Sequence, residues 1–559
     1  MMLQLSVFIL QVTVFSCVHI HNVTQKCLED TEGFLSELHN DRPSKYAMLM
    51  YDAFGKMGSD VVGGNVNRPG SLQECLLVHG PAFNGQFCQE SIQYFVDICV
   101  PGSCNEDEVQ ALVVYSEYPR SKCEIKIPFN GILTYLIYIY TQLFCFVNIM
   151  LYLHEIFCHL DRVSVYLHLT IQCSFLVDCL YDCLQSFSLQ RTTAGVLNTA
   201  SNGQSYLCLN GIRILSLLWI ISGHSVQFYY CLFPDNDKRW KEAVEKNPLY
   251  IFSFSGPVYL AVDTFLLLGG LLSAKSLLAS IEATDDKLSP ALVAKFLFKR
   301  FKRCVVQLLF IVCLVIGLFS VIPKGPFWVI VEDQILSCKT YWWSNLLLIN
   351  NLLDISDVCA PWTWYLSIDF QFFISTPLLI FIYRLDYETY FQYYYNKPYT
   401  RYGPYLVGIL VGIFMKTKQL GWASCLSIMA LLVGLAYALR GVPSHPSVPH
   451  SLYQGLHRTL WAMSVAWIIL ACEEGYGGLV NRILSLNMWI PLSNISFACY
   501  LIHPVLIILY NGKQETAIHY TDLNFFYLFM GHTALTVTSG YILTVLIERP
   551  FSFLKSCSK

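Results

Sequence analysis

Charged residues are scarce in this chain. Only 13% of its 559 residues are Asp, Glu, Lys or Arg, while 55% are hydrophobic. Soluble domains carry about 25% charged residues, so the balance excludes an ordinary soluble protein. Repeated apolar runs of membrane-spanning length indicate a multi-span helical membrane protein. A formal net charge of −3, with no basic tail, argues against a nucleic-acid partner.

The sequence also lacks the short motifs of several common enzyme classes. It has no G-x-S-x-G nucleophile elbow and no Walker-type GxxxxGK, which argues against hydrolase and ATPase chemistry. It has no HxxxxD motif, which a glycerolipid acyltransferase of the soluble-domain type would carry. Paired CxxC clusters and zinc-type histidine spacings are missing too, so no metal site is predicted.

Cysteine, in contrast, is abundant, and its 22 copies fall into two groups. Most are scattered through apolar segments, where cysteine acts as a small hydrophobic residue. Six lie in the hydrophilic N-terminal region: Cys27, Cys75, Cys88, Cys99, Cys104 and Cys123. Behind a signal-like segment they predict up to three disulfides in an oxidising compartment, with the pairing left open. Cys338 and Cys359, in the predicted exterior loop 323–362, are a further candidate pair; two free thiols are the alternative.

The N-terminal part is predicted to lie outside the cell or in a lumen. Residues 1–19 have the length and apolarity of a signal peptide, although an uncleaved anchor is the alternative. Asn22 begins an N-x-T glycosylation sequon. Residues 24–125 carry the six cysteines and dense Gly and Pro turn signals, which predicts a small disulfide-rich domain.

The rest of the chain is predicted to form roughly ten membrane helices. Residues 131–182 hold a first span and an extra apolar segment, 163–180, which we expect at the interface. A multi-span domain follows over 205–548, with a cytoplasmic tail at 549–559. Basic residues favour the cytoplasm, so the run from Lys295 to Arg303 is interpreted as a cytoplasmic loop before a span near 303–322. With that orientation the count of crossings leaves one span unaccounted for near 384–401.

One of these spans, Leu209 to Tyr230, carries an arginine and a histidine. The eleven-residue step from Arg213 to His224 returns to within about 20° of the same helix face, about 16 Å along the axis. A charged or titratable side chain at membrane depth costs at least ~2–3 kcal/mol unless it faces a polar cavity. The pair therefore predicts a helix that lines a site, with snorkelling of Arg213 to the headgroups as the alternative.

Three further intramembrane residues are candidates for the same site. Asp263 is predicted to orient His224 or to neutralise Arg213, or else to lie at a helix end near the headgroups. Asp369 lies six residues into its span and is expected to have a partner. His503 precedes Pro504, which opens the helix backbone and lets a polar group be accommodated.

Aromatic and charged residues at the ends of spans are given a simpler interpretation. Trp364 and Tyr365 are assigned to the interfacial aromatic belt. Glu548 and Arg549 are assigned as an interfacial pair at the end of the last span.

Several ordered motifs give the chain a family resemblance. LNGIRILSLLWIISGH (209–224) resembles the opening helix of the acyltransferase 3 family, in which an arginine precedes a histidine by eleven residues. The segments WTWYLSIDFQFF (362–373), NKPYTRYGPYLVGIL (396–410) and SNISFACYLIHP (493–504) resemble the nose-resistant-to-fluoxetine branch, as does the six-cysteine domain. The resemblance covers roughly 25–125 and 183–555. Relative to it, the stretch 154–182 is extra and one span after the WYL helix is missing.

The resemblance implies an enzyme of the plasma membrane or endoplasmic reticulum. Such a protein would transfer an acyl group from acyl-CoA, as co-substrate, to a hydroxyl of a lipid, sterol or other acceptor. The helix-borne histidine, here His224, would be the catalytic base. Arg213 would bind a phosphate or carboxylate of the donor. The alternative is transport of lipids or small amphipathic compounds across epithelial membranes without a covalent step.

Overall fold

The structure of the chain is a computed structural model that describes most of the two predicted domains. It covers residues 23–56, 65, 68–91, 95–112, 120–123, 186–199, 206–230, 235–246, 257–284, 288–322, 327–354, 357–383, 418–439, 448–514 and 516–553. Several predictions concern residues outside these ranges: the signal peptide, the glycosylation sequon at Asn22, the segments 131–153 and 163–180, and the loop 384–401 near which one span is unaccounted for.

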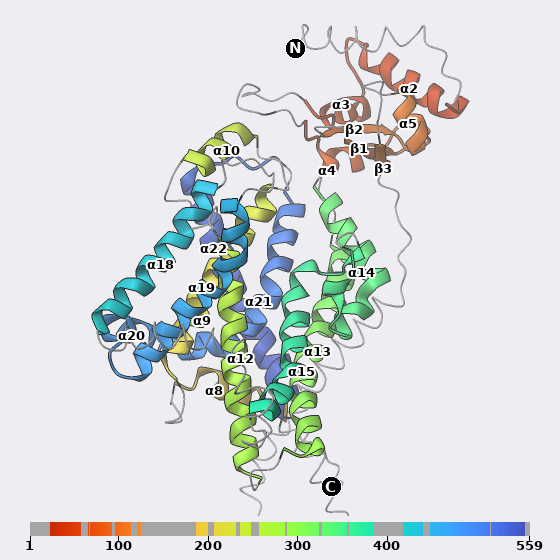
Figure 1. Ribbon diagram of the computed structural model, residues 1–559. Helices are drawn as coiled ribbons and strands as arrows, with labels where there is room; N and C mark the ends of the chain where they lie inside the picture. The colour runs from red at the N-terminus through yellow and green to blue at the C-terminus, as the bar shows by residue number, and fades with distance from the viewer. Residues whose placement is uncertain are drawn as a thin grey trace, which may run out of the picture.

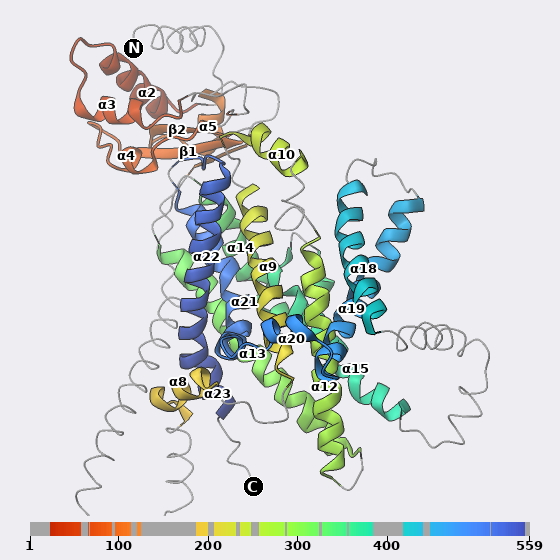
Figure 2. The same ribbon diagram turned by 90° about the vertical axis from the view of Figure 1, so that its left-hand side faces the viewer.

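In the N-terminal domain, the described residues form four short helices and a small antiparallel sheet. The helices are α2 (Gln25–Leu38), α3 (Lys45–Asp52), α4 (Leu72–Leu76) and α5 (Glu106–Leu112). The strands β1 (Gly85–Ser91), β2 (Phe95–Pro101) and β3 (Arg120–Cys123) lie in the order β2-β1-β3. Figures 1 and 2 show this domain beyond the end of the helix bundle at which α10 lies.

Disulfides hold this domain together, as the cysteine pattern predicts. Cys27 bonds to Cys104, and Cys75 bonds to Cys99. Cys88 is disulfide-bonded as well, and the β1–β3 register places it opposite Cys123. The bonded cysteines 27, 75, 88, 99 and 104 are buried among the domain's apolar side chains. Cross-links therefore supplement a core that is small for an independent domain.

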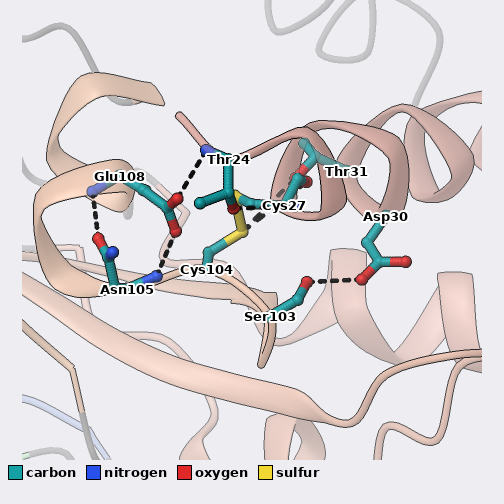
Figure 3. Close-up of a disulfide and its surroundings, with 8 residues drawn as sticks. All are labelled: Thr24, Cys27, Asp30, Thr31, Ser103, Cys104, Asn105 and Glu108. Carbon is teal, nitrogen blue, oxygen red and sulfur yellow. Dashed lines mark hydrogen bonds between the residues drawn. A yellow bond between two sulfur atoms is a disulfide. The ribbon is translucent and has the colours of Figure 1, made fainter. Parts of the chain in front are cut away.

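Glu108 joins the first turns of two helices in this domain (Figure 3). One carboxylate oxygen accepts the backbone N–H of Asn105 at 2.7 Å, and the other accepts the N–H of Thr24 at 2.7 Å. The Asn105 side chain accepts from the Glu108 N–H in return, at 2.9 Å, which completes a capping box. Burial alone raises the pKa of Glu108, but the hydrogen bonds from Asn105 and Thr24 outweigh it and lower the pKa.

The second domain is a bundle of long helices with short helical connections. Its elements are α8 (Leu189–Leu197), α9 (Cys208–Tyr230), α10 (Asp237–Lys246), α12 (Tyr259–Glu282), α13 (Pro290–Val321), α14 (Val329–Leu346), η2 (Asn350–Leu352), η4 (Pro361–Thr363), α15 (Trp364–Tyr383), α18 (Lys418–Ala438), α19 (Val448–Glu473), α20 (Gly478–Leu484), α21 (Trp489–Gly512), α22 (Asp522–Leu543), the π-helical turn η7 (Thr544–Glu548) and α23 (Arg549–Phe553). Within the described residues, six helices are long and apolar enough to cross a membrane. The predicted multi-span all-α membrane protein with a disulfide-rich N-terminal domain is confirmed.

The centre of the bundle is α21, which packs against α9, α13, α14 and α22. Figure 2 shows α22, α21 and α9 side by side. A glycine permits the closest approach, because a Cβ on Gly540 of α22 would lie 2.4 Å from the Cys499 sulfur and 3.1 Å from its backbone nitrogen. Close backbone contact at small residues is a common way for membrane helices to pack. The central helix is therefore held firmly where its polar residues lie.

On the side of the bundle nearer the N-terminal domain, α14 is tied back to the start of α15. Cys338 bonds to Cys359. The buried Asn345 side chain donates to the Cys359 carbonyl at 2.9 Å and to the Thr363 hydroxyl at 2.8 Å. These bonds fix the segment from which α15 enters the bundle.

Candidate functional site

A cavity of about 330 Å³ lies among five helices of the bundle. Side chains of α9, α12, α13, α15 and α21 form its wall. Four of them are basic: Arg213, Lys299, Arg300 and Arg303. The other lining residues are mostly apolar, aromatic or hydroxyl-bearing: Phe265, Leu268, Gly269, Leu272, Ser273, Ser276, Phe296, Cys304, Tyr365, Leu366, Phe373, Ser493, Ser496, Phe497 and Tyr500. The cavity therefore suits a ligand with an anionic part and an apolar part.

Helix α13 supplies three of the four cations. Ser289 caps its first turn and Pro290 occupies the start, a position where proline favours a helix. The lining residues 296, 299, 300, 303 and 304 follow the spacing of one helix face. The prediction of a loop before a span near 303–322 is wrong, since the basic run forms the first turns of a 32-residue helix; its cytoplasmic side stays a prediction. Hydropathy did not predict the true start of the helix, because the basic segment lowers the mean hydropathy of its N-terminal part.

Asp369 of α15 holds one of these cations in place. Its Oδ2 accepts from Arg300 Nη2 at 2.6 Å. A Cβ on Gly269 of α12 would lie 2.7 Å from the other carboxylate oxygen, so the glycine makes room for this carboxylate. Arg300 also lies over the Phe373 ring, 5.4 Å from its centroid. Among the described residues its buried Nε has no hydrogen-bond acceptor, which leaves one donor for a ligand.

Arg213 reaches the cavity from α9. Its Nη1 donates to the Ser493 hydroxyl of α21 at 2.8 Å. Within the part of the chain that the structure describes, no carboxylate forms an ion pair with it. A partly buried cation that donates to a neutral hydroxyl is suited to an anionic ligand.

Arg303 is paired with the far end of the chain. Its Nε and Nη2 donate to Glu548 Oε1 at 3.1 and 2.7 Å. The predicted interfacial pair of Glu548 with Arg549 is therefore wrong, because Glu548 is buried and faces α13. The π-helical turn η7 carries Glu548 to this position at the end of the last span.

His224 does not line the cavity but meets His503. His224 Nδ1 and His503 Nε2 are 2.8 Å apart, and the two rings stack at 5.0 Å with an 11° angle between planes. The second ring nitrogen of His503, Nδ1, lies 3.1 Å from the Cys499 carbonyl oxygen. The structure thus brings together two predicted site residues that lie 279 positions apart.

Tyr500 connects this histidine pair with the cavity. It lines the cavity, and its ring lies 5.8 Å from that of His503 on the next turn of α21. Its hydroxyl donates to the Trp362 carbonyl at 2.5 Å, which fixes the ring. Tyr365 packs edge-on against Tyr500 at 5.5 Å and also lines the cavity. The assignment of Tyr365 to the interfacial belt is therefore wrong, whereas Trp364 is exposed.

Asp263 is the candidate that the structure does not bring to the others. It lies on α12, yet it is not among the cavity residues. Within the described residues no hydrogen bond joins Asp263 to Arg213 or His224, and its buried Oδ2 accepts none. Sequence position along a helix fixed its depth but not the face it occupies.

A third histidine, His532 of α22, was missed by the sequence interpretation. Its Nδ1 lies 3.0 Å from the Ser225 hydroxyl, next to His224, and it is buried. A histidine within an apolar span is a functional candidate by default, and that signal was present in the sequence. Across the described residues, no group of three His, Cys, Asp or Glu side chains is placed to hold a metal ion.

Comparison with known protein families matches a segment of each domain. Residues 27–97 match the family described as the nose resistant-to-fluoxetine protein N-terminal domain, and residues 206–386 match an acyltransferase domain. The chain is therefore similar to proteins of the nose-resistant-to-fluoxetine type in a segment of each domain. The predicted resemblance is confirmed, although α21, with His503 and Tyr500, lies beyond the matched acyltransferase segment.

Two proteins of Caenorhabditis elegans are similar to this chain. One, "Nose resistant to fluoxetine protein 6", is 26% identical over 438 residues, covering 66% of this chain and 52% of that protein. The other, "Regulator of hypoxia-inducible factor 1", is 21% identical over 450 residues, covering 67% of this chain and 84% of that protein. The chain thus spans about half the length of the first relative. No solved structure matches.

Proposed function

We propose that this membrane acyltransferase-like protein transfers an acyl group from acyl-CoA to a hydroxyl of a lipid, sterol or other acceptor. The observation that carries the proposal is the cavity with four cations and an apolar wall, connected through Tyr500 to a histidine pair. The matched acyltransferase domain supports the reaction class. The donor and the acceptor are inferences from the chemistry of the site.

The basic residues suit the phosphates of the donor. Arg213, Arg300 and Lys299 offer charge-assisted hydrogen bonds, which are about twice as strong as neutral ones. Asp369 neutralises one cation and Glu548 another, so two positive charges remain in excess. The cavity of about 330 Å³ is at the low end of the range for small-molecule sites, so it would hold part of the donor.

The histidine pair, on the other side of Tyr500 from the cavity, supplies the base for the reaction. The acceptor hydroxyl oxygen attacks the thioester carbonyl carbon while His224 takes the hydroxyl proton as general base. The tetrahedral intermediate collapses, the carbon–sulfur bond breaks, and the departing sulfur receives the proton back from His224. The products are an ester and free coenzyme A, so atoms and charge balance.

The test is transfer of a radiolabelled acyl group from acyl-CoA to membrane lipids by the purified full-length protein in nanodiscs. Arg213→Gln should raise KM for acyl-CoA about tenfold or more, because a hydrogen bond to a charged group contributes about 1.5–3 kcal/mol. Lys302→Gln is the matched control, since it removes the same charge from α13 at a residue that does not line the cavity. Its KM should stay within about twofold of wild type.

Two results would overturn the proposal. Absence of transfer to lipid, sterol and glycan acceptors by the wild-type protein would do so, above all if a labelled lipid still crosses the bilayer. Equal KM values for the Arg213 and Lys302 variants would remove the cavity from donor binding.

A further inference from the structure

Three groups lie in line on α21 and α9: the Cys499 carbonyl, the His503 ring and the His224 ring. The carbonyl oxygen is 3.1 Å from His503 Nδ1, and His503 Nε2 is 2.8 Å from His224 Nδ1. All three lie within the part of the bundle where α9, α21 and α22 pack together. This chain of hydrogen bonds has a direction, because the Cys499 carbonyl oxygen can only accept a hydrogen bond.

The direction of the chain assigns the protons on both rings. A carbonyl oxygen has no hydrogen to donate, so His503 Nδ1 carries the N–H. In a neutral imidazole the other nitrogen then has a lone pair, so His503 Nε2 accepts and His224 Nδ1 donates. Both rings are neutral in this arrangement, which suits the full burial of His503 and the partial burial of His224 in apolar helices. The lone pair of His224 is therefore on Nε2.

The backbone at Cys499 is held so that the chain keeps its geometry. Gly540 lets α22 approach within contact of the Cys499 nitrogen and sulfur, and that sulfur donates to the Thr536 carbonyl at 3.5 Å. Pro504 lacks the N–H that would otherwise bond to the carbonyl four residues earlier, which opens the backbone beside His503. His503 itself has no exposed surface. These contacts hold the His503 ring in one orientation.

We propose that His503 is a positioning residue that makes Nε2 of His224 the general base. The inference rests on the proposed acyl transfer. His503 accepts the Nδ1 proton of His224 in a hydrogen bond and so fixes both the tautomer and the plane of that ring. When His224 takes the acceptor proton, the same bond stabilises its positive charge, while His503 stays neutral and bonded to the Cys499 carbonyl. This arrangement parallels the part that an aspartate plays beside the histidine of a catalytic triad.

His457 of α19 offers a matched control. It is also buried, it stacks on Tyr453 at 4.7 Å, and its Nδ1 lies 2.7 Å from the carbonyl oxygen four residues earlier. It therefore repeats the carbonyl contact of His503 in another membrane helix without a contact to His224. Replacing each histidine by phenylalanine separates the effect of a lost buried histidine from the effect of a lost relay.

The kinetic test uses the full-length protein in nanodiscs with labelled acyl-CoA. His503→Phe should lower kcat about 10²-fold or more, the size of a general-base contribution, and leave KM for acyl-CoA unchanged. His503→Gln keeps an oxygen acceptor for His224 and should retain kcat within about tenfold. His457→Phe should keep the wild-type kcat. Equal kcat values for the two phenylalanine variants, or no recovery with glutamine, would overturn the relay.

A second measurement does not depend on activity. Nitrogen-15 NMR of the histidine-labelled full-length protein distinguishes the two neutral tautomers, with the His224 signals assigned from a His224→Gln sample. The wild-type protein should show the proton on Nδ1, and His503→Phe should lose this preference. A wild-type spectrum with the proton on Nε2 would overturn the relay even if acyl transfer is observed. The expected tautomer without any acyl transfer would instead count against the proposed function.

Discussion

Asp369 and Asp263 provide a direct test of what holds the cavity together. Both lie within long apolar helices. Within the described residues Asp369 forms a hydrogen-bonded ion pair, with Arg300 at 2.6 Å, whereas Asp263 interacts with the charge of Arg458 without such a bond. The buried Oδ2 of Asp263 accepts no hydrogen bond from the residues that the structure describes. Replacing each aspartate by asparagine keeps the shape and removes the charge. We expect Asp369→Asn to destabilise the protein and Asp263→Asn to leave its stability nearly unchanged.

The size of the effect follows from the exposure of the pair. Removing one partner of a fully buried ion pair costs about 3–5 kcal/mol, because the other charge is left without compensation. The Asp369 side chain is 6% exposed, but that of Arg300 is 31% exposed and faces the cavity. Water in the cavity would therefore screen part of the loss, which reduces the expected cost to about 2–3 kcal/mol. For Asp263→Asn we expect a change within about 1 kcal/mol.

The assay is SDS-induced unfolding of the full-length protein in mixed micelles, followed by tryptophan fluorescence. The double variant Asp369→Asn/Arg300→Gln completes the comparison. If the two residues stabilise each other, the double variant should lose less stability than the sum of the single variants. Equal losses for Asp369→Asn and Asp263→Asn, or additive losses in the double variant, would refute the reasoning.

Three further predictions follow from local geometry. Gly269→Ala should cost about 1–3 kcal/mol, because its methyl would lie 2.7 Å from a carboxylate oxygen of α15, whereas Gly270→Ala meets nothing within 4 Å and should be neutral or stabilising in the same unfolding assay. The lowered pKa of Glu108 means that its stabilisation is complete above its unfolded pKa and is lost as pH falls through its folded pKa. Amide hydrogen exchange at the caps of α2 and α5 should therefore show an acid-induced acceleration in wild type that is missing in Glu108→Gln. Replacing Cys338 and Cys359 by alanine opens a cross-link with a sequence separation of 21 and should cost about 3 kcal/mol; an unfolding midpoint equal to that of the wild type would contradict this.

The sequence predicted the parts of the fold that depend on composition and spacing. Apolar runs gave the membrane helices, and the cysteine pattern gave a disulfide-rich N-terminal domain. The cost of burying polar groups singled out Arg213, His224, Asp369 and His503 as residues that need partners. That argument depends on the depth of a residue in the membrane, which can be predicted from its position within an apolar run.

The partners themselves depend on which helices meet, and a single sequence does not record that. His224 and His503 lie far apart in the chain, as do Arg303 and Glu548, so no local pattern pairs them. Tyr365 was assigned to the membrane interface because residue type and position near a span end suit both roles. To distinguish a membrane-interface residue from a cavity residue, one must know which face of α15 packs against α21.

The π-helical turn between α22 and α23 has a consequence for the end of the chain. A wider turn inserts about one residue relative to an α-helix, so every side chain beyond it is rotated by about 100° about the axis. Without that insertion, the acid that meets α13 would be carried around to another side of the helix. Removing one residue from this turn would thus misalign the last buried acid while leaving the composition of the span almost unchanged. The π-helical turn thus determines that Glu548 is the acid that pairs with Arg303 of α13.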